Sequence, residues 1–332
     1  MDQHLPHNLK LSIVVPVYRS ESILPSLVGE VRAAMLEQGL QDDFELVLVN
    51  DASTDGSWMR IKQLAEEHKF IVAISLTKNF GQHNATMAGL NYARGDVVVI
   101  MDDDLQHSPS AISSLLDGLK SGADVCFVRY RNRQHASWKK LGSWFNDLVA
   151  TILLGKPRGL YLSSFKALKH PIVEEIIKYD GPYAYIDGLI LDVTRSIIAI
   201  DIEHEARFSG KGNYTLKKSI SLWLKMATSF SILPLRIASV AGIVLATLSL
   251  VLIMIIVIQK FSHPEIPAGW ASLAAAILFV GGAQFACIGL VGEYLGRAYL
   301  KLNRKPQFVV REITHATQIV TASVRGGGGY EQ

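Results

Sequence analysis

Apolar and polar residues alternate in two rhythms through the first hundred residues of this 332-residue chain. Short apolar runs typical of buried strands are separated by stretches whose apolar residues recur at the spacing of a helix face. The predicted strands are 11–17, 44–49, 71–76 and 97–101, and the predicted helices between them are 23–38, 57–68 and 82–94. This alternation predicts an α/β fold with a mostly parallel sheet covered on both faces.

Two long uncharged runs lie in the last third of the chain. Ile237–Ile258 has 22 residues and Ile266–Gly292 has 27, and Lys260 and Glu265 are the only Lys, Arg, Asp or Glu residues between 237 and 292. At about 1.5 Å per residue, each run can cross a hydrocarbon core of about 30 Å. We therefore expect transmembrane helices over 236–259 and 266–293, with a pair of buried core helices as the alternative.

The flanks of these runs indicate their orientation. Four basic residues precede the first run and four follow the second, whereas the connecting loop has one Lys and one Glu; the basic residues are Lys217, Lys218, Lys225, Arg236, Arg297, Lys301, Arg304 and Lys305. By the positive-inside rule, both termini and the domain 1–235 are expected in the cytosol. The segment 1–10 has no apolar stretch, so no signal peptide is expected.

Composition excludes several other classes. Charged residues make up 19% of the chain against about 25% in typical proteins, and the deficit lies in the two uncharged runs. A net charge of +3 without a basic stripe argues against a nucleic-acid partner. Two cysteines, Cys126 and Cys287, cannot form a disulfide scaffold and are expected to be packed thiols.

Two further segments are amphipathic. Residues of about 138–154 and 214–230 place aromatic and aliphatic side chains on one helix face and lysines beside it. Such helices are typical of a membrane interface, and packing on the sheet is the alternative. Residues 294–332 are expected to form a cytosolic C-terminal segment whose tail, weakly patterned from Thr314 and ending in Gly326–Gly329, is disordered.

Polar residues follow each of the four predicted strands, where a parallel sheet binds its ligands. Neither G-x-G-x-x-G nor a P-loop follows any strand. Asp102-Asp103-Asp104 follows the fourth strand, and alternation puts Asp102 and Asp104 on one side with Gln106 two residues further on. Adjacent carboxylates repel unless a cation is near, so this run favours a Mg²⁺ or Mn²⁺ site; a solvated turn capping the next helix is the alternative.

Asp51, after the second strand, is a further carboxylate expected in the same crevice. A carboxylate there can accept hydrogen bonds from a nucleobase or a ribose hydroxyl. The following Ser53, Thr54 and Asp55 are explained by capping of the next helix.

These segments together resemble a known family. Val15-Pro16-Val17-Tyr18, Val49-Asn50-Asp51-Ala52-Ser53-Thr54-Asp55, Asn79-Phe80-Gly81-Gln82-His83 with Met87-Ala88-Gly89-Leu90, and Asp102-Asp103-Asp104-Leu105-Gln106 are similar to the motifs of the family 2 glycosyltransferases of Rossmann-like GT-A fold. With the two C-terminal spans, the chain resembles the polyprenyl-phosphate glycosyltransferases, which include dolichyl-phosphate mannose synthase, GtrB-type and ArnC-type enzymes. The resemblance covers about 11–310.

The resemblance implies roles for individual residues. Asp102, Asp103 and Asp104 are the candidate catalytic residues, and Asp102, Asp104 and Gln106 the candidate metal ligands. Contacts to the nucleotide sugar are expected from Pro16, Tyr18, Glu21, Asp51, Lys78, Gly81, Asp102 and Asp103, and contacts to phosphate or acceptor from Arg129, Arg207 and Lys211. Asp103 could orient the acceptor, although turn geometry explains it equally well.

The implied reaction is metal-dependent, inverting transfer of a sugar from a nucleotide sugar such as UDP-glucose to a polyprenyl phosphate, at the cytosolic face of a bacterial inner membrane. A separate flippase for the product is expected, and homo-oligomerisation is left open. Transfer to another membrane lipid, or a catalytically silent scaffold or sugar-nucleotide sensor, is the alternative. The chain departs from the family pattern at Arg19-Ser20, Leu160, Lys166 and Gly212, so the sequence does not identify the sugar.

Overall fold

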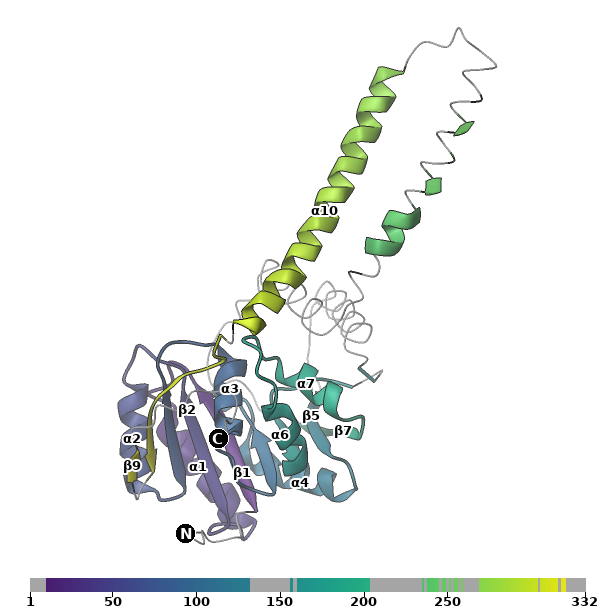
Figure 1. Cartoon of the computed structure of the whole chain (residues 1–332). Coiled ribbons are helices and arrows are strands. Elements are labelled where there is room, and N and C mark those ends of the chain that lie inside the picture. Colours follow the sequence, from purple (N-terminus) through teal and green to yellow (C-terminus); the bar gives the residue numbers. More distant parts are fainter. Residues whose placement is uncertain are drawn as a thin grey trace, which may run out of the picture. The chain divides into compact units, whose positions relative to one another are not determined.

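The computed structural model describes residues 10–131, 156–157, 160–203, 269–303, 305–315 and 318–320, with short helical pieces between 235 and 258 (Figure 1). The chain divides into two compact units. The first comprises Met1–Tyr214 and Asn303–Gln332, and the second Thr215–Leu302.

The first unit is built on one sheet of nine described strands in the order β7-β5-β6-β4-β1-β2-β3-β8-β9. Of these strands, β6 and β8 run against the direction of the others, so the sheet is mostly parallel, as predicted. The strands are β1 (Leu11–Val17), β2 (Phe44–Asn50), β3 (Ile71–Leu76), β4 (Val97–Ile100), β5 (Val125–Arg131), β6 (Lys166–Lys169), β7 (Ile197–Glu203), β8 (Val310–His315) and β9 (Gln318–Val320).

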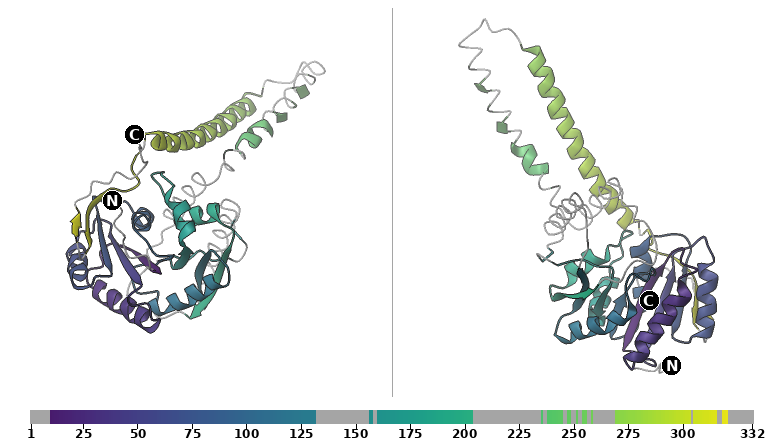
Figure 2. Two further views of the ribbon diagram at one scale, coloured as in Figure 1. Left: turned by 60° about the horizontal axis from the view of Figure 1, so that its bottom comes forward. Right: turned by 180° about the vertical axis from the view of Figure 1, so that it is seen from behind.

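Helices cover both faces of this sheet (Figure 2). Every residue of β1, β2 and β3 is buried, which explains why these strands are continuous apolar runs. On the opposite face from the main core, Gly89 of α3 lies so close to Val14 and Val49 that a Cβ would meet Val14 Cγ1 at 2.4 Å. The helices are α1 (Leu24–Glu37), α2 (Ser57–Glu67), α3 (Gln82–Leu90), the 3₁₀ helix η1 (Pro109–Ala111), α4 (Ile112–Lys120), α6 (His170–Ile177) and α7 (Ile186–Val193).

The C-terminal segment contributes two strands to the sheet, which the sequence analysis did not predict. β8 pairs with β3 in antiparallel register, from Val72 opposite His315 to Leu76 opposite Val310, and β9 pairs with β8. Glu312 of β8 accepts a hydrogen bond from Trp58 Nε1 at 3.2 Å and lies 3.6 Å from Lys62 Nζ, both on α2. β8 therefore covers the edge of β3, and the glycine run 326–329 lies outside the described residues.

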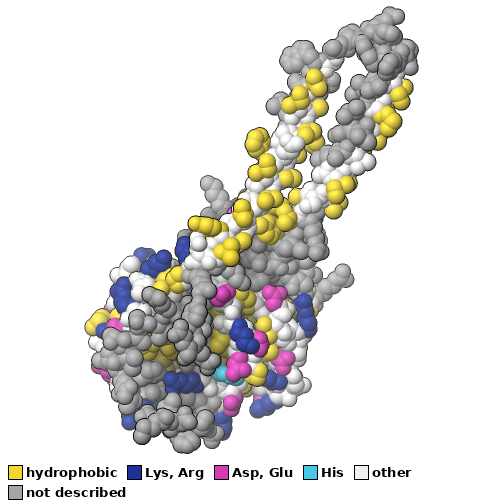
Figure 3. Space-filling view, viewed as in Figure 1, with side chains coloured by type: hydrophobic (Ala, Val, Ile, Leu, Met, Phe, Trp, Pro, Cys, Tyr) yellow, Lys and Arg dark blue, Asp and Glu magenta, His cyan; other side chains and the backbone are white. Residues whose placement is uncertain are grey.

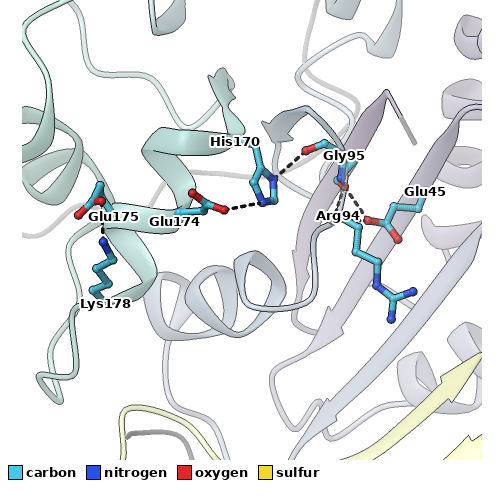
Figure 4. A network of polar contacts seen from close by, with 8 residues as sticks. Glu45, Arg94, Gly95, His170, Glu174, Glu175 and Lys178 are labelled. Carbon is cyan, nitrogen blue, oxygen red and sulfur yellow. Dashed lines mark hydrogen bonds and ion pairs between the residues drawn. The ribbon is translucent and has the colours of Figure 1, made fainter. Parts of the chain in front are cut away.

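A hydrogen-bonded turn at residues 94–95 precedes β4, the strand that leads to the aspartate run (Figure 4). The Glu45 carboxylate accepts hydrogen bonds from Ser12 Oγ at 2.6 Å and from the Arg94 amide at 2.7 Å. The Gly95 amide donates to Ser12 Oγ at 2.7 Å, and His170 Nδ1 donates to the Gly95 carbonyl at 2.9 Å. These bonds satisfy the buried polar groups of Ser12, Glu45 and Gly95.

Gly95→Ala is expected to destabilise the protein by about 3 kcal/mol, because the new Cβ would overpack a close backbone contact. It would lie 2.4 Å from Ser12 N and 2.6 Å from Leu11 C, neither of which can move without breaking the pairing of β1. Thermal or urea unfolding of the purified protein measures the effect. Gly29→Ala on α1 is the control: it meets nothing within 4 Å and should stabilise by about 0.5–1 kcal/mol. A Gly95→Ala protein as stable as the Gly29→Ala control would contradict the overpacking.

The described part of the second unit contains α10 (Trp270–Leu302), a helix of 33 residues. Large apolar side chains project from it (Figure 3). Leu273, Phe285 and Leu295 are 63%, 78% and 67% exposed. Within the described residues, Phe279–Leu300 is the one stretch long and apolar enough to cross a membrane. The predicted span 266–293 overlaps it, whereas the predicted span 236–259 is described only in short helical pieces.

Candidate active site

The loops that follow β1, β2, β3 and β4 lie at one edge of the sheet. Val17 at the end of β1 pairs with Asn50, which pairs with Ser75 of β3, and β4 runs parallel to β1 with Ile100 opposite Val14. Hydrogen bonds join the loop after β4 to those after β1 and β3, and the loop after β2 to that after β3. The predicted gathering of polar residues at this edge is therefore present.

Asp103 connects the loop after β4 to the loop after β1. Its Oδ2 atom accepts hydrogen bonds from the Tyr18 amide at 3.1 Å and from Ser20 Oγ at 2.5 Å. Burial raises the pKa of Asp103, and these hydrogen bonds only partly oppose that shift. In this arrangement Asp103 holds the turn, which favours the second of the two readings given to it from sequence.

Asp102 lies among groups that favour its charged form. Oδ1 accepts a hydrogen bond from Gln82 Nε2 at 2.6 Å, and Oδ2 lies 3.8 Å from His107 Nε2. Burial disfavours the carboxylate, but hydrogen bonds from His107 and Ser164 and the nearby positive charges bring the pKa of Asp102 below its usual value. Asp102 is therefore an anion at neutral pH.

Asp104 is paired with Gln106, the third residue proposed as a metal ligand. The Gln106 backbone amide donates to Asp104 Oδ1 at 3.1 Å, and the Gln106 side-chain amide donates to Oδ2. Leu105 between them has φ +54°, a left-handed conformation that turns the chain back on itself and is uncommon for a leucine. The turn thus brings the two proposed ligands into direct contact.

Residues 102–106 after β4, which we call the acidic turn, offer few but suitable metal ligands. No group of three or more His, Cys, Asp or Glu side chains in the described part of the chain is arranged to hold a metal ion. Asp102 and Asp104 provide two carboxylates, the number that Mg²⁺ commonly takes from a protein when phosphate and water complete its shell. The chemistry of the residues present therefore fits a divalent cation bound together with a diphosphate.

Asp51 holds the loop after β3. Its two oxygens accept hydrogen bonds from the Phe80 amide at 2.7 Å and the Gly81 amide at 2.9 Å, and the residue is 3% exposed. Burial raises the pKa of Asp51, while the two amides oppose that shift. Gly81 has φ +88° and is the N-cap that precedes α3, so the loop needs glycine at this position. Each Asp51 oxygen has a second lone pair that can accept a further hydrogen bond. The contact with the nucleotide stays a prediction.

The residues predicted around the nucleotide differ in exposure. Pro16 is buried within β1, whereas Tyr18 is 43% exposed and carries the Arg19 guanidinium 5.3 Å from its ring centroid. Glu21 accepts a hydrogen bond from the Gly56 amide at 2.9 Å, at the start of α2. Lys78 is exposed, with Nζ 5.0 Å from the Phe80 ring centroid.

The candidate phosphate-binding cations are only partly described. Arg129 forms a two-pronged ion pair with Asp201 of the adjacent strand β7, with contacts of 2.5 and 3.0 Å. The paired carboxylate raises the pKa of Arg129. Arg207, Lys211 and the two amphipathic segments lie outside the described residues.

Sequence reasoning missed a buried ion pair beside the aspartate run. Lys166 on β6 is 3% exposed and donates to Asp187 Oδ1 on α7, which is 9% exposed. His83 is close enough for the charges of Asp187, Lys166 and Asp102 to act on it, and burial lowers the pKa of His83. A single lysine and a single aspartate, each within an apolar run, were the only signals of this pair.

Comparison with known proteins identifies the family of the chain. The model of glycosyl transferase family 2 matches residues 12–177, and that of the GtrB C-terminal hairpin matches residues 233–298. The undecaprenyl-phosphate 4-deoxy-4-formamido-L-arabinose transferases of Photorhabdus laumondii and Proteus mirabilis are 34% and 33% identical to this chain, over 92% of it and 94% of each relative.

Among solved structures, the chain is similar to glucosyl-3-phosphoglycerate synthase from Mycobacterium tuberculosis in complex with Mn²⁺, uridine-diphosphate-glucose and phosphoglyceric acid. The similarity has a TM-score of 0.47 and 18% identity, and covers 67% of this chain and 78% of that one. The family match and the relatives, which align over nearly the whole chain, establish that this protein is a glycosyltransferase belonging to glycosyl transferase family 2.

Proposed function

We propose that this enzyme transfers a monosaccharide from a nucleotide sugar to undecaprenyl phosphate or a similar polyprenyl phosphate, at the cytosolic face of the bacterial inner membrane. The observation that carries the proposal is the name shared by relatives that align over more than nine-tenths of both chains. The hairpin match over residues 233–298 and the exposed apolar helix α10 support an acceptor whose tail lies in a bilayer.

The acidic turn after β4 is the proposed site of Mg²⁺ or Mn²⁺. Asp102 and Asp104 would hold the ion, with Gln106 as a further contact. The bound ion would supply positive charge that stabilises the departing nucleoside diphosphate. The low pKa of Asp102 keeps this ligand ionised at neutral pH.

The chain's own residues arrange the donor around this turn. Asp103 and Asp51 fix the loops that carry Tyr18 and Lys78, which we propose contact the nucleoside and its phosphates. An oxygen of the lipid phosphate then forms a bond to the anomeric carbon as the bond to the nucleoside diphosphate breaks, which inverts that carbon. A phosphate monoester with a second pKa near 6 is mostly dianionic at pH 7, so no strong general base is needed.

Two departures from the ArnC-type pattern bear on the choice of sugar. Leu160, which is 8% exposed, and Lys166, which pairs with Asp187, occupy positions at which the ArnC-type pattern has an acid and an arginine. The donor panel must therefore include glucose, amino sugars and deoxy sugars. The product would be a lipid-linked monosaccharide on the cytosolic leaflet, and a separate flippase would move it across the membrane.

A radiolabel transfer assay tests this function. Membranes containing the full chain are incubated with undecaprenyl phosphate, Mg²⁺ or Mn²⁺, and a panel of labelled nucleotide sugars. We expect an organic-extractable labelled product with one donor, and its loss when the metal is chelated. A product formed on diacylglycerol instead would contradict the acceptor, and no transfer from any donor would favour a silent scaffold.

A further inference from the structure

The segment 305–315, which follows α10 in sequence, makes a second set of contacts besides the pairing of β8. We call these residues the C-terminal strap. Gln307 and Phe308 are each 8% exposed, and Val310 and Ile313 are 4% and 5% exposed. The strap is thus packed into the first unit at several positions from Gln307 to Ile313, before the chain reaches β9.

The strap binds Thr77, the residue at which the loop after β3 begins, through two hydrogen bonds. The Thr77 amide donates a hydrogen bond to the Val309 carbonyl at 2.9 Å, and Arg311 Nη2 donates to the Thr77 carbonyl at 2.8 Å. Both backbone polar groups of Thr77 are therefore bound to the strap. The next residue is Lys78, and the amides held by Asp51 follow at Phe80 and Gly81.

The strap also reaches this loop from the other side, through residues 181–184. Gln307 Nε2 donates to the Gly181 carbonyl at 2.9 Å. The buried Asn84 side chain then joins that segment to the loop: it donates to the carbonyls of Pro182 at 3.2 Å and Phe80 at 3.1 Å. It also accepts from the Ala184 amide at 3.3 Å. Loop 77–81 is thus fixed at its start by Arg311 and near its end through Gln307 and Asn84.

Loosening a loop that contacts a ligand weakens binding, because the loop must be ordered when the ligand binds. Asp51 holds only the far end of loop 77–81, so its near end depends on the strap. We propose that the C-terminal strap is a positioning element of the donor-nucleotide site, in which Arg311 and Gln307 keep loop 77–81 in its binding conformation. This inference rests on the proposed function, because it takes loop 77–81 to contact the nucleotide sugar.

Arg311→Met in the full chain tests the strap, since Arg311 is exposed and its loss leaves the core intact. We expect the Kd for UDP with Mg²⁺, measured by calorimetry, and the KM for the donor to rise about five-fold, with kcat within two-fold of wild type. Hydrogen exchange of amides 77–81 should speed up by a similar factor while β2 stays protected. Gln307→Ala should act in the same direction, and Arg311→Lys should recover part of the loss.

Arg60→Met is the matched control, because Arg60 is exposed on α2 and contacts Gln63. Its Kd for UDP should equal that of wild type. Wild-type protein that binds UDP, together with an Arg311→Met variant that binds it equally well, would overturn the strap proposal alone. Lower kcat with an unchanged Kd for UDP would also overturn it. Wild-type protein that binds none of UDP, GDP, CDP and dTDP would contradict the proposed function, and the strap proposal with it.

Discussion

Asp104→Ala is expected to reduce sugar transfer to lipid by about a thousand-fold or more, which corresponds to about 4 kcal/mol of lost transition-state stabilisation. The substitution removes one of the two carboxylates proposed to hold the divalent cation, together with the hydrogen bond from the Gln106 side-chain amide to Asp104. The rate of transfer from the active labelled donor measures the loss. Because the pairing is local, between residues 104 and 106 of a half-buried turn, the midpoint of thermal unfolding should change little.

Asp117→Ala provides the matched control for this experiment. Asp117 is a surface aspartate on α4 whose side chain is 69% exposed and pairs with Lys120. Its removal should leave transfer at the wild-type rate, since exposed ion pairs contribute little. Transfer by Asp104→Ala at the wild-type rate, at any Mg²⁺ or Mn²⁺ concentration, would remove Asp104 from the metal site.

Lys166→Met is expected to destabilise the protein by about 3–5 kcal/mol, because it leaves the Asp187 carboxylate buried without its partner. The pair is buried between β6 and α7, and Lys166 Nζ is also 5.1 Å from the centroid of the Phe127 ring. Thermal unfolding of the purified protein in detergent, followed by tryptophan fluorescence, measures the change. The substitution acts on the stability of the fold, so sugar-transfer activity should fall in proportion to the fraction of protein that is folded.

The double substitution Lys166→Met with Asp187→Leu distinguishes two causes of the lost stability: the loss of the ion-pair attraction itself, and the burial of an unpaired Asp187 carboxylate. It should recover most of the lost stability, because apolar side chains of similar size can replace a buried ion pair. Lys178→Met is the control: the Lys178–Glu175 pair is exposed, and its loss should cost less than about 0.5 kcal/mol. A Lys166→Met protein with wild-type stability would show that Asp187 is solvated or neutral.

The core of the fold was predictable because its pattern is local. The predicted strands 11–17 and 71–76 agree with β1 and β3 at both ends, and 44–49 and 97–101 differ from β2 and β4 by one residue. The predicted helix 82–94 is too long, since α3 ends at Leu90. The Asn91 side chain donates to the Met87 carbonyl there, which is a common way for asparagine to compete with helical bonding.

The residues of the candidate site could be predicted from the sequence, but the hydrogen bonds between them could not. Parallel strands bring Asp51 and the aspartate run to one edge, which follows from the alternation of elements alone. That Asp103 would bind the Tyr18 amide, 85 residues away, depends on the left-handed backbone of Arg19 and the loop it turns. Contacts of this kind depend on how distant segments meet in the fold and not on the spacing of residues along the sequence. Residue types alone therefore did not reveal them.

β8 was missed for the same reason. Residues 310–315 are short and follow a long apolar helix, and their partner strand lies far back in the sequence: Arg311 and Thr77 are 234 residues apart. A six-residue strand carries too little periodicity to be distinguished from a loop when its neighbour is unknown. The strap therefore became visible only in the folded structure.

The pairing of β8 with β3 has a consequence for biosynthesis. Residues 11–76 leave the ribosome first and can assemble β1, β2 and β3, but β3 keeps an uncovered edge until residues 310–315 have been translated. The intervening chain includes α10, so the catalytic sheet is completed only after the apolar helix has been made. A nascent chain stalled before residue 303 would expose this edge to other chains, because β8 can pair with β3 only after residues 310–315 have been translated.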